Sequence, residues 1–163
     1  MKTLKQLFST TFIVFLSFLA TIPCSVGLYA SSESAKPNIL LILADDLSWF
    51  DLGCYGSKDV NTPNIDKLAR EGMTFNHAYT ATAMCAPTRQ QLYTGLFPVR
   101  SGAMGNHSSV KTGTKSMVHH LSELGYEVSL SGKEHFGPPA SFPFEKREGL
   151  KIPSGPEPFC LVL

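Results

Sequence analysis

The stretch PNILLILADD, residues 37–46, decides the fold that this sequence predicts. It is a short, continuous apolar run that ends in two carboxylates, Asp45 and Asp46. Continuous apolarity over such a length indicates a strand that is buried on both faces, as in the parallel sheet of an α/β protein. Open parallel sheets form their sites at the carboxyl ends of strands, where these two aspartates would lie.

The segments that follow continue an α/β pattern. TPNIDKLAREG (62–72) has Thr at the N-cap, Pro at the first helical position and Gly at the end, so it predicts a helix. MTFNHAY (73–79) alternates like a short strand, further helices are predicted at 87–95 and 116–124, and YEVSLSG (126–132) predicts another strand. This order indicates an α/β fold with a mixed, mostly parallel sheet flanked by helices.

The two ends of the chain differ from this pattern. Residues 1–30 have the layout of a secretory signal peptide: Lys2 and Lys5 precede an uncharged apolar run, and small residues follow it. An uncleaved membrane anchor is the alternative, but we expect cleavage, no stable membrane span afterwards, and a secreted or periplasmic protein. Residues 139–163 are rich in Pro and show no periodicity, which predicts a loop-like tail.

Composition narrows the function classes. The 163 residues carry a formal net charge of +1, which gives no basis for a nucleic-acid partner. A hydrophobic content of 43% with 17% charged residues is typical of a globular protein. Behind the leader, Cys54, Cys85 and Cys160 have no C-x-x-C spacing, which argues against a disulfide framework or a zinc site.

Three places in the sequence could carry chemistry, and each has a plain alternative. Asp45 and Asp46 suit a hard divalent cation, or form a solvated turn. Cys85 precedes a predicted helix with Arg89 one turn on, which suits a stabilised thiolate, or it is an inert buried thiol. In GKEHFGP (132–138), Lys133 and His135 would share one face of an extended segment and suit an anionic group, although a single histidine there is more often a solvated loop residue. His77, His107, His119 and His120 receive no role.

Taken together, these segments resemble the N-terminal part of the sulfatase family, which has an alkaline-phosphatase-like fold. The ordered match is PNILLILADD, NTPNIDKLAREG, CAPTRQQLYTG and GKEHFG, and it predicts an N-terminal part of a sulfatase catalytic domain at residues 36–138. The C-x-P-x-R pattern, here Cys85, Pro87 and Arg89, is what the formylglycine-generating enzyme recognises in that family. Thr88 stands where Ser is commonest.

The resemblance implies a mechanism and its residues. Cys85 would be oxidised to formylglycine (3-oxoalanine), whose hydrate attacks sulfur and then eliminates sulfate. Asp45, Asp46 and residue 85 would hold Ca²⁺, with Mg²⁺ as the other candidate. Arg89 would steady the alkoxide, Lys133 would neutralise sulfate charge, and His135 would hydrogen-bond the hydrate and assist elimination.

The resemblance also sets the expected substrate. GKEHFGP followed by SFPFE is similar to sulfamidase and related heparan-type sulfatases more than to arylsulfatases, which implies a sulfated sugar of the glycosaminoglycan kind, such as an N-sulfated glucosamine, with an aryl sulfate as the other candidate substrate. Sulfatases are several hundred residues long, so we expect this chain to be an incomplete fragment, inactive alone. The alternatives are a phosphatase or phosphonate hydrolase of the same superfamily, and a non-catalytic remnant that binds sulfated glycans.

Overall fold

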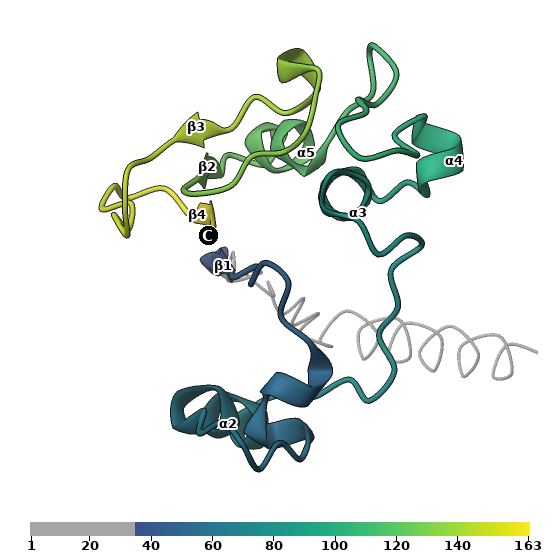
Figure 1. Ribbon diagram of the computed structural model, residues 1–163. Coiled ribbons are helices and arrows are strands. Elements are labelled where there is room, and N and C mark those ends of the chain that lie inside the picture. Colours follow the sequence, from purple (N-terminus) through teal and green to yellow (C-terminus); the bar gives the residue numbers. More distant parts are fainter. Residues whose placement is uncertain (1–34) are drawn as a thin grey trace, which may run out of the picture. The chain divides into compact units, whose positions relative to one another are not determined.

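Four strands form the sheet of the computed structural model, which describes residues 35–163 (Figure 1). The strands are β1 (Ile39–Leu41), β2 (Glu127–Leu130), β3 (Glu145–Lys146) and β4 (Phe159–Val162). They are ordered β1-β4-β2-β3, and each neighbouring pair is parallel. The predicted parallel α/β sheet is therefore confirmed, whereas the predicted signal peptide at 1–30 lies outside the described residues.

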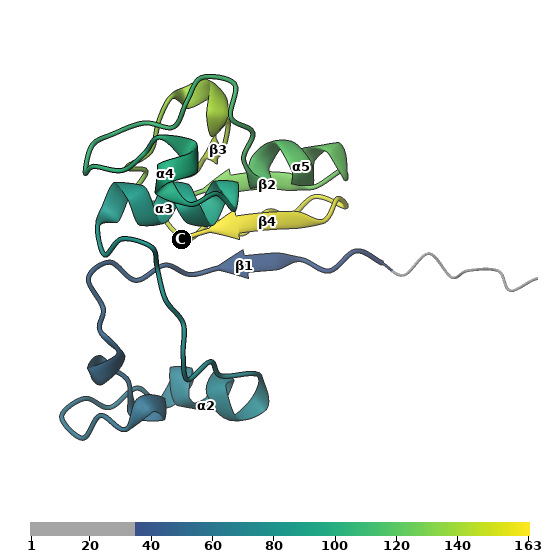
Figure 2. The same ribbon diagram turned by 90° about the vertical axis from the view of Figure 1, so that its right-hand side faces the viewer.

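Two of the helices, α3 (Cys85–Thr94) and α5 (Met117–Glu123), lie on one side of this sheet (Figures 1 and 2). The other helical segments are η1 (Trp49–Asp51), η2 (Gly53–Tyr55), α2 (Pro63–Glu71), α4 (Pro98–Ser101) and η3 (Pro139–Ser141). Tyr93 of α3 and Val118 of α5 share a buried cluster with β2 and β4. The three predicted helices are confirmed as α2, α3 and α5. No helix in residues 35–163 is long and apolar enough to span a membrane.

The C-terminal segment is not the loop that the sequence predicts. Strand β4 lies between β1 and β2, and its Cys160 and Leu161 have no exposed surface. Backbone bonds continue the pairing beyond the strand, because Leu163 N donates to Leu41 O at 2.9 Å. The prolines before it made residues 139–163 look irregular, but the terminal apolar run pairs on both sides and is central to the sheet.

The same segment supplies aromatic residues to the core. Phe142 and Phe144 pack edge-on against Tyr93 of α3, with ring centroids 6.3 Å and 5.2 Å away. Phe136, which follows β2, lies 5.7 Å from the same ring. Aromatic side chains bury large areas, and edge-to-face contacts add to that burial, so this cluster fixes α3 against the end of the sheet.

Two further predictions are wrong for this part of the chain. The first strand was expected to be buried on both faces, but Leu40 is 53% exposed and Ile42 is 66% exposed. Side chains alternate along a strand, and Ile39 and Leu41 take the face that packs against the core. Residues 73–79 were expected to form a strand, but they form no helix or strand, and Met73 and Tyr79 are exposed. Alternating polarity alone does not make a strand where there is no partner for pairing.

Candidate active site

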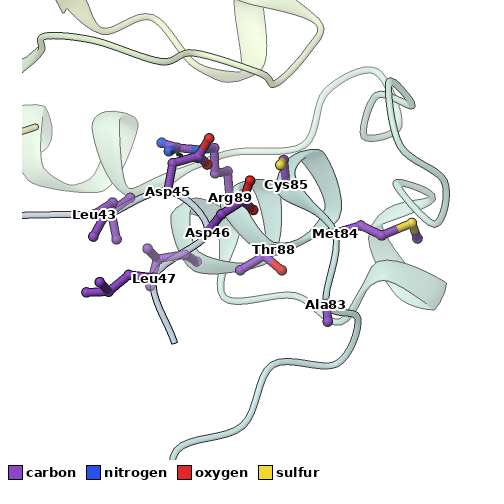
Figure 3. A pocket seen from close by; sticks show the side chains of 11 residues that line it. Leu43, Asp45, Asp46, Leu47, Ala83, Met84, Cys85, Thr88 and Arg89 are labelled. Carbon is purple, nitrogen blue, oxygen red and sulfur yellow. Dashed lines mark hydrogen bonds and ion pairs between the residues drawn. The ribbon is translucent and has the colours of Figure 1, made fainter. Parts of the chain in front are cut away.

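The parallel sheet brings three predicted site residues to one edge. Asp45 follows the carboxyl end of β1, and Lys133 follows the carboxyl end of β2. Because all neighbouring strands are parallel, these ends lie on the same side of the sheet. Cys85 is the first residue of α3 and faces the same place (Figure 3), where residues of the β1 loop and of α3 line a cleft of about 330 Å³.

Helix α3 is built to present Cys85 at its start. Met84 is the N-cap with an extended backbone, and Pro87 stands in the first turn, where a backbone N–H would have no partner within the helix. Gly95 ends the helix at φ +68°, and its N–H donates to Gln91 O at 2.8 Å. Pro87 is buried, so it also packs the first turn against the core. Cys85 itself remains half-buried at the positive end of the helix.

Asp45 lies at the centre of the charged contacts. Its Oδ2 accepts a hydrogen bond from Lys133 Nζ at 2.5 Å, and its Oδ1 lies 3.5 Å from an Arg89 guanidinium nitrogen. The hydrogen bond from Lys133 holds the pKa of the Asp45 carboxyl below its usual value, although burial acts in the opposite direction. The same bond raises the pKa of Lys133, so both groups stay ionised at neutral pH.

The cysteine is joined to this pair. Lys133 Nζ lies 3.4 Å from Cys85 Sγ, and Arg89 donates to the backbone carbonyl of Lys133 at 3.1 Å. The Arg89 side chain is only 9% exposed, so its guanidinium has a fixed place beneath the cleft. Lys133 thus contacts the predicted nucleophile and Arg89 lines the same cleft, so two cations are available to an anionic substrate there.

The residues predicted to hold a metal also cluster. One ligand atom each from Asp45, Asp46 and Cys85 lie within 4.8 Å of one another. Asp46 has φ +53°, a conformation that Asp adopts more readily than most residues, and Figure 3 shows both carboxylates on the loop after β1, facing α3. Carboxylate oxygens fit a hard cation such as Ca²⁺, and an oxygen on residue 85 would fit better than sulfur. Three ligands are fewer than the six to eight that Ca²⁺ takes.

His135 contacts a second histidine, His107, and its backbone departs from the extended segment predicted for Lys133 and His135. His135 has φ +47°, so the segment is not regularly extended, and its Nε2 lies 3.0 Å from His107 Nδ1. Burial, and then the neighbouring His107, lower the pKa of His135. Within residues 35–163, the side-chain hydrogen bond of His135 is with His107 and not with Cys85 or Lys133.

Sequence reasoning missed the residues that hold the loops around α3. Gln90 is fully buried, and its amide bonds the backbone of Ser108, Val110 and Gly137. Asn106 Oδ1 accepts a hydrogen bond from Ala86 N at 3.3 Å, at the first turn of α3. A glutamine within a predicted helix gives no sign that its buried side chain holds two loops, because its partners are distant in sequence.

Comparison with known proteins identifies the family. The family model described as Sulfatase matches residues 37–153, so the chain belongs to the sulfatase family. An ulvan-active sulfatase of Formosa agariphila is 44% identical over 124 residues, which cover 76% of this chain and 25% of that protein. The N-acetylgalactosamine-6-sulfatase of Rattus norvegicus is 37% identical over 126 residues, covering 69% of this chain and 24% of that protein.

A solved sulfatase structure agrees with this assignment. The structure of a 2-O GAG sulfatase superposes with a TM-score of 0.65 at 25% identity, covering 78% of this chain and 34% of that one. The chain thus spans about a quarter of the length of the curated relatives that it matches.

Proposed function

We propose that this chain carries the formylglycine part of a sulfatase active site that hydrolyses sulfate esters or sulfamates on sulfated sugars. The observation that carries the proposal is the contact of Lys133 with both Asp45 and Cys85, at the carboxyl edge of a parallel sheet. The names of the relatives, an ulvan-active sulfatase and an N-acetylgalactosamine-6-sulfatase, support a carbohydrate substrate.

Each charged residue of the site has its own role. The Lys133 ammonium lies between the Asp45 carboxylate and Cys85. From there it neutralises the charge of a sulfate oxygen. Arg89, fixed by Asp45 and by the carbonyl of Lys133, steadies negative charge on residue 85. Converted to formylglycine, residue 85 supplies a hydroxyl nucleophile in place of the thiol. Conversion requires a formylglycine-generating enzyme, which would act on the Cys85-Ala-Pro87-Thr-Arg89 motif.

The metal site would be shared with other parts of a longer protein. Asp45, Asp46 and an oxygen of residue 85 would hold Ca²⁺, or Mg²⁺, which polarises sulfate oxygens and lowers the pKa of a bound hydroxyl. Since three ligands do not complete a Ca²⁺ site, we propose that the 163 residues alone are inactive. The signal peptide at 1–30 would direct the protein to the periplasm or the exterior.

A chimera tests the proposal. Residues 36–163 replace the matching segment of the ulvan-active sulfatase, and the protein is expressed together with a formylglycine-generating enzyme. We expect turnover of 4-nitrophenyl sulfate by the chimera, loss of that turnover in Cys85→Ala, and none by the 163-residue chain alone. N-sulfoglucosamine and 4-nitrophenyl phosphate, assayed in parallel, separate sulfamidase and phosphatase activity. A folded chimera without sulfate turnover, or an active 163-residue chain, would overturn the proposal.

A further inference from the structure

The side chains of His107 and His135 contact each other near the first turn of α3. The distance from His135 Nε2 to His107 Nδ1 is 3.0 Å, and the ring centroids are 4.8 Å apart. His107 lies in the loop between α4 and α5, and His135 lies after β2. The contact therefore joins two loops that meet near the first turn of α3, where Asn106 accepts a hydrogen bond from Ala86 N.

Both histidines are held in an uncommon backbone conformation. His107 has φ +65° and His135 has φ +47°, a region that residues other than glycine seldom occupy. Such conformations persist where the surroundings enforce them. Here Val110 N donates to Gly137 O at 2.9 Å, and both segments are bonded to the Gln90 amide. The backbone that holds both loops thus brings the two rings together, with His107 exposed and His135 half-buried.

The surroundings decide where the ring proton lies. His135 Nδ1 is buried and has no hydrogen-bond partner among residues 35–163. A proton on Nδ1 would bury an N–H donor without an acceptor, which is rare and costly in proteins. A proton on Nε2 instead has an acceptor 3.0 Å away in His107 Nδ1.

We propose that His107 is a positioning residue for His135: His107 Nδ1 accepts the Nε2 proton of His135 and leaves Nδ1 as the proton-accepting nitrogen of that ring. Burial, together with His107, Lys133 and Arg89, keeps the pKa of His135 below its ordinary value against the opposing effect of Asp45. The ring is therefore held neutral and in one tautomer. The inference rests on the proposed function only for the use of that nitrogen, because the sulfatase resemblance gives His135 a part in the elimination of sulfate.

Nitrogen NMR of the histidine-labelled 163-residue chain, at about pH 8 where imidazoles are neutral, tests the inference. We expect the His135 proton on Nε2, a scalar coupling between His135 Nε2 and His107 Nδ1, and slow exchange of this proton with water. His107→Gly suits the positive φ and removes the ring. It should speed exchange about tenfold, the factor for losing one hydrogen bond of ordinary net strength.

Two variants complete the experiment. His107→Asn tolerates the same φ and places an amide oxygen on Cγ, where the histidine has Nδ1, so it should restore slow exchange. His77→Asn removes a histidine that contacts Tyr79 and should leave the His135 signals unchanged. A proton on His135 Nδ1, unchanged exchange in His107→Gly, or no rescue by His107→Asn would each overturn the inference. None of these readouts needs conversion of Cys85 or any turnover, so they do not depend on the proposed activity.

Discussion

Replacing Gln90 by leucine should loosen both loops that surround the start of α3. The Gln90 side chain is fully buried, so a leucine of similar size fills its space and the loss is one of hydrogen bonds. Its Nε2 donates to Ser108 O at 2.8 Å. Its Oε1 accepts from Val110 N at 3.0 Å and from Gly137 N at 3.4 Å.

The size of the effect follows from the groups left without a partner. Val110 N also donates to Gly137 O at 2.9 Å, so it stays bonded in the variant. Ser108 O and Gly137 N have Gln90 as their hydrogen-bond partner within residues 35–163, and both lose it. An unsatisfied buried group costs about 1–3 kcal/mol. Gly137 N is buried, whereas Ser108 O is half-buried and water can replace part of its bond, so the free energy of unfolding should fall by about 1–3 kcal/mol, chiefly through Gly137 N.

The matched control is the next residue along the same helix. Gln91 Oε1 accepts from Ala81 N at 3.2 Å and from Thr80 Oγ1 at 3.4 Å, in exposed positions where water can replace it. Gln91→Leu should therefore change the free energy of unfolding by less than about 1 kcal/mol. Urea unfolding followed by circular dichroism measures both variants. If Gln90→Leu were as stable as Gln91→Leu, the view that the buried Gln90 side chain holds two loops would be wrong.

Two further predictions concern the carboxylate pair and the C-terminal strand. Because the pKa of Asp45 is lowered on folding, its contribution to stability is present above its ordinary value of 3.8 and is lost as pH falls through the lower folded value. The measurement is the urea midpoint as a function of pH. Asp45→Asn should reduce the loss of stability at acid pH, whereas Asp46→Asn should keep the loss that is due to the Asp45–Lys133 pair. Equal slopes in wild type and Asp45→Asn would contradict this prediction. Leu161→Ala, at a position with 0% exposure, should cost about 2–5 kcal/mol in urea unfolding. Leu150→Ala, at 70% exposure in the same segment, should cost about 0.5 kcal/mol or less, and equal effects would show that β4 is not part of the core.

Local signals predicted the helices well. Helix α2 begins and ends at the Pro and Gly that mark it in the sequence, and α3 ends at Gly95 in the left-handed conformation. Strand β4 had no such local signal. It exists because an apolar run at the end of the chain pairs with β1 and β2, which are distant in sequence, and pairing of that kind cannot be read from a short window.

The candidate site divides in the same way. The rule that sites form at the carboxyl ends of parallel strands pointed to Asp45 and Asp46, the start of a predicted helix pointed to Cys85, and the segment after a predicted strand pointed to Lys133. Gln90 and His107 were not found, because their roles depend on loops that fold back onto α3. A histidine in an exposed loop resembles any solvated histidine until the structure shows its neighbour His135.

The most direct test of the central claim is mass spectrometry of residue 85. The chain is co-expressed with an active formylglycine-generating enzyme, and trypsin releases residues 71–89 as one peptide that contains Cys85. The account predicts the loss of mass that accompanies conversion of CH₂SH to CHO. It predicts no such loss when Arg89 is replaced, in which case trypsin no longer cuts at residue 89 and a longer peptide is analysed. If Cys85 instead alkylates as an ordinary thiol while a known substrate is converted in the same cells, Cys85 is not a maturation site. The chain would then be better explained as a non-catalytic remnant that binds sulfated glycans.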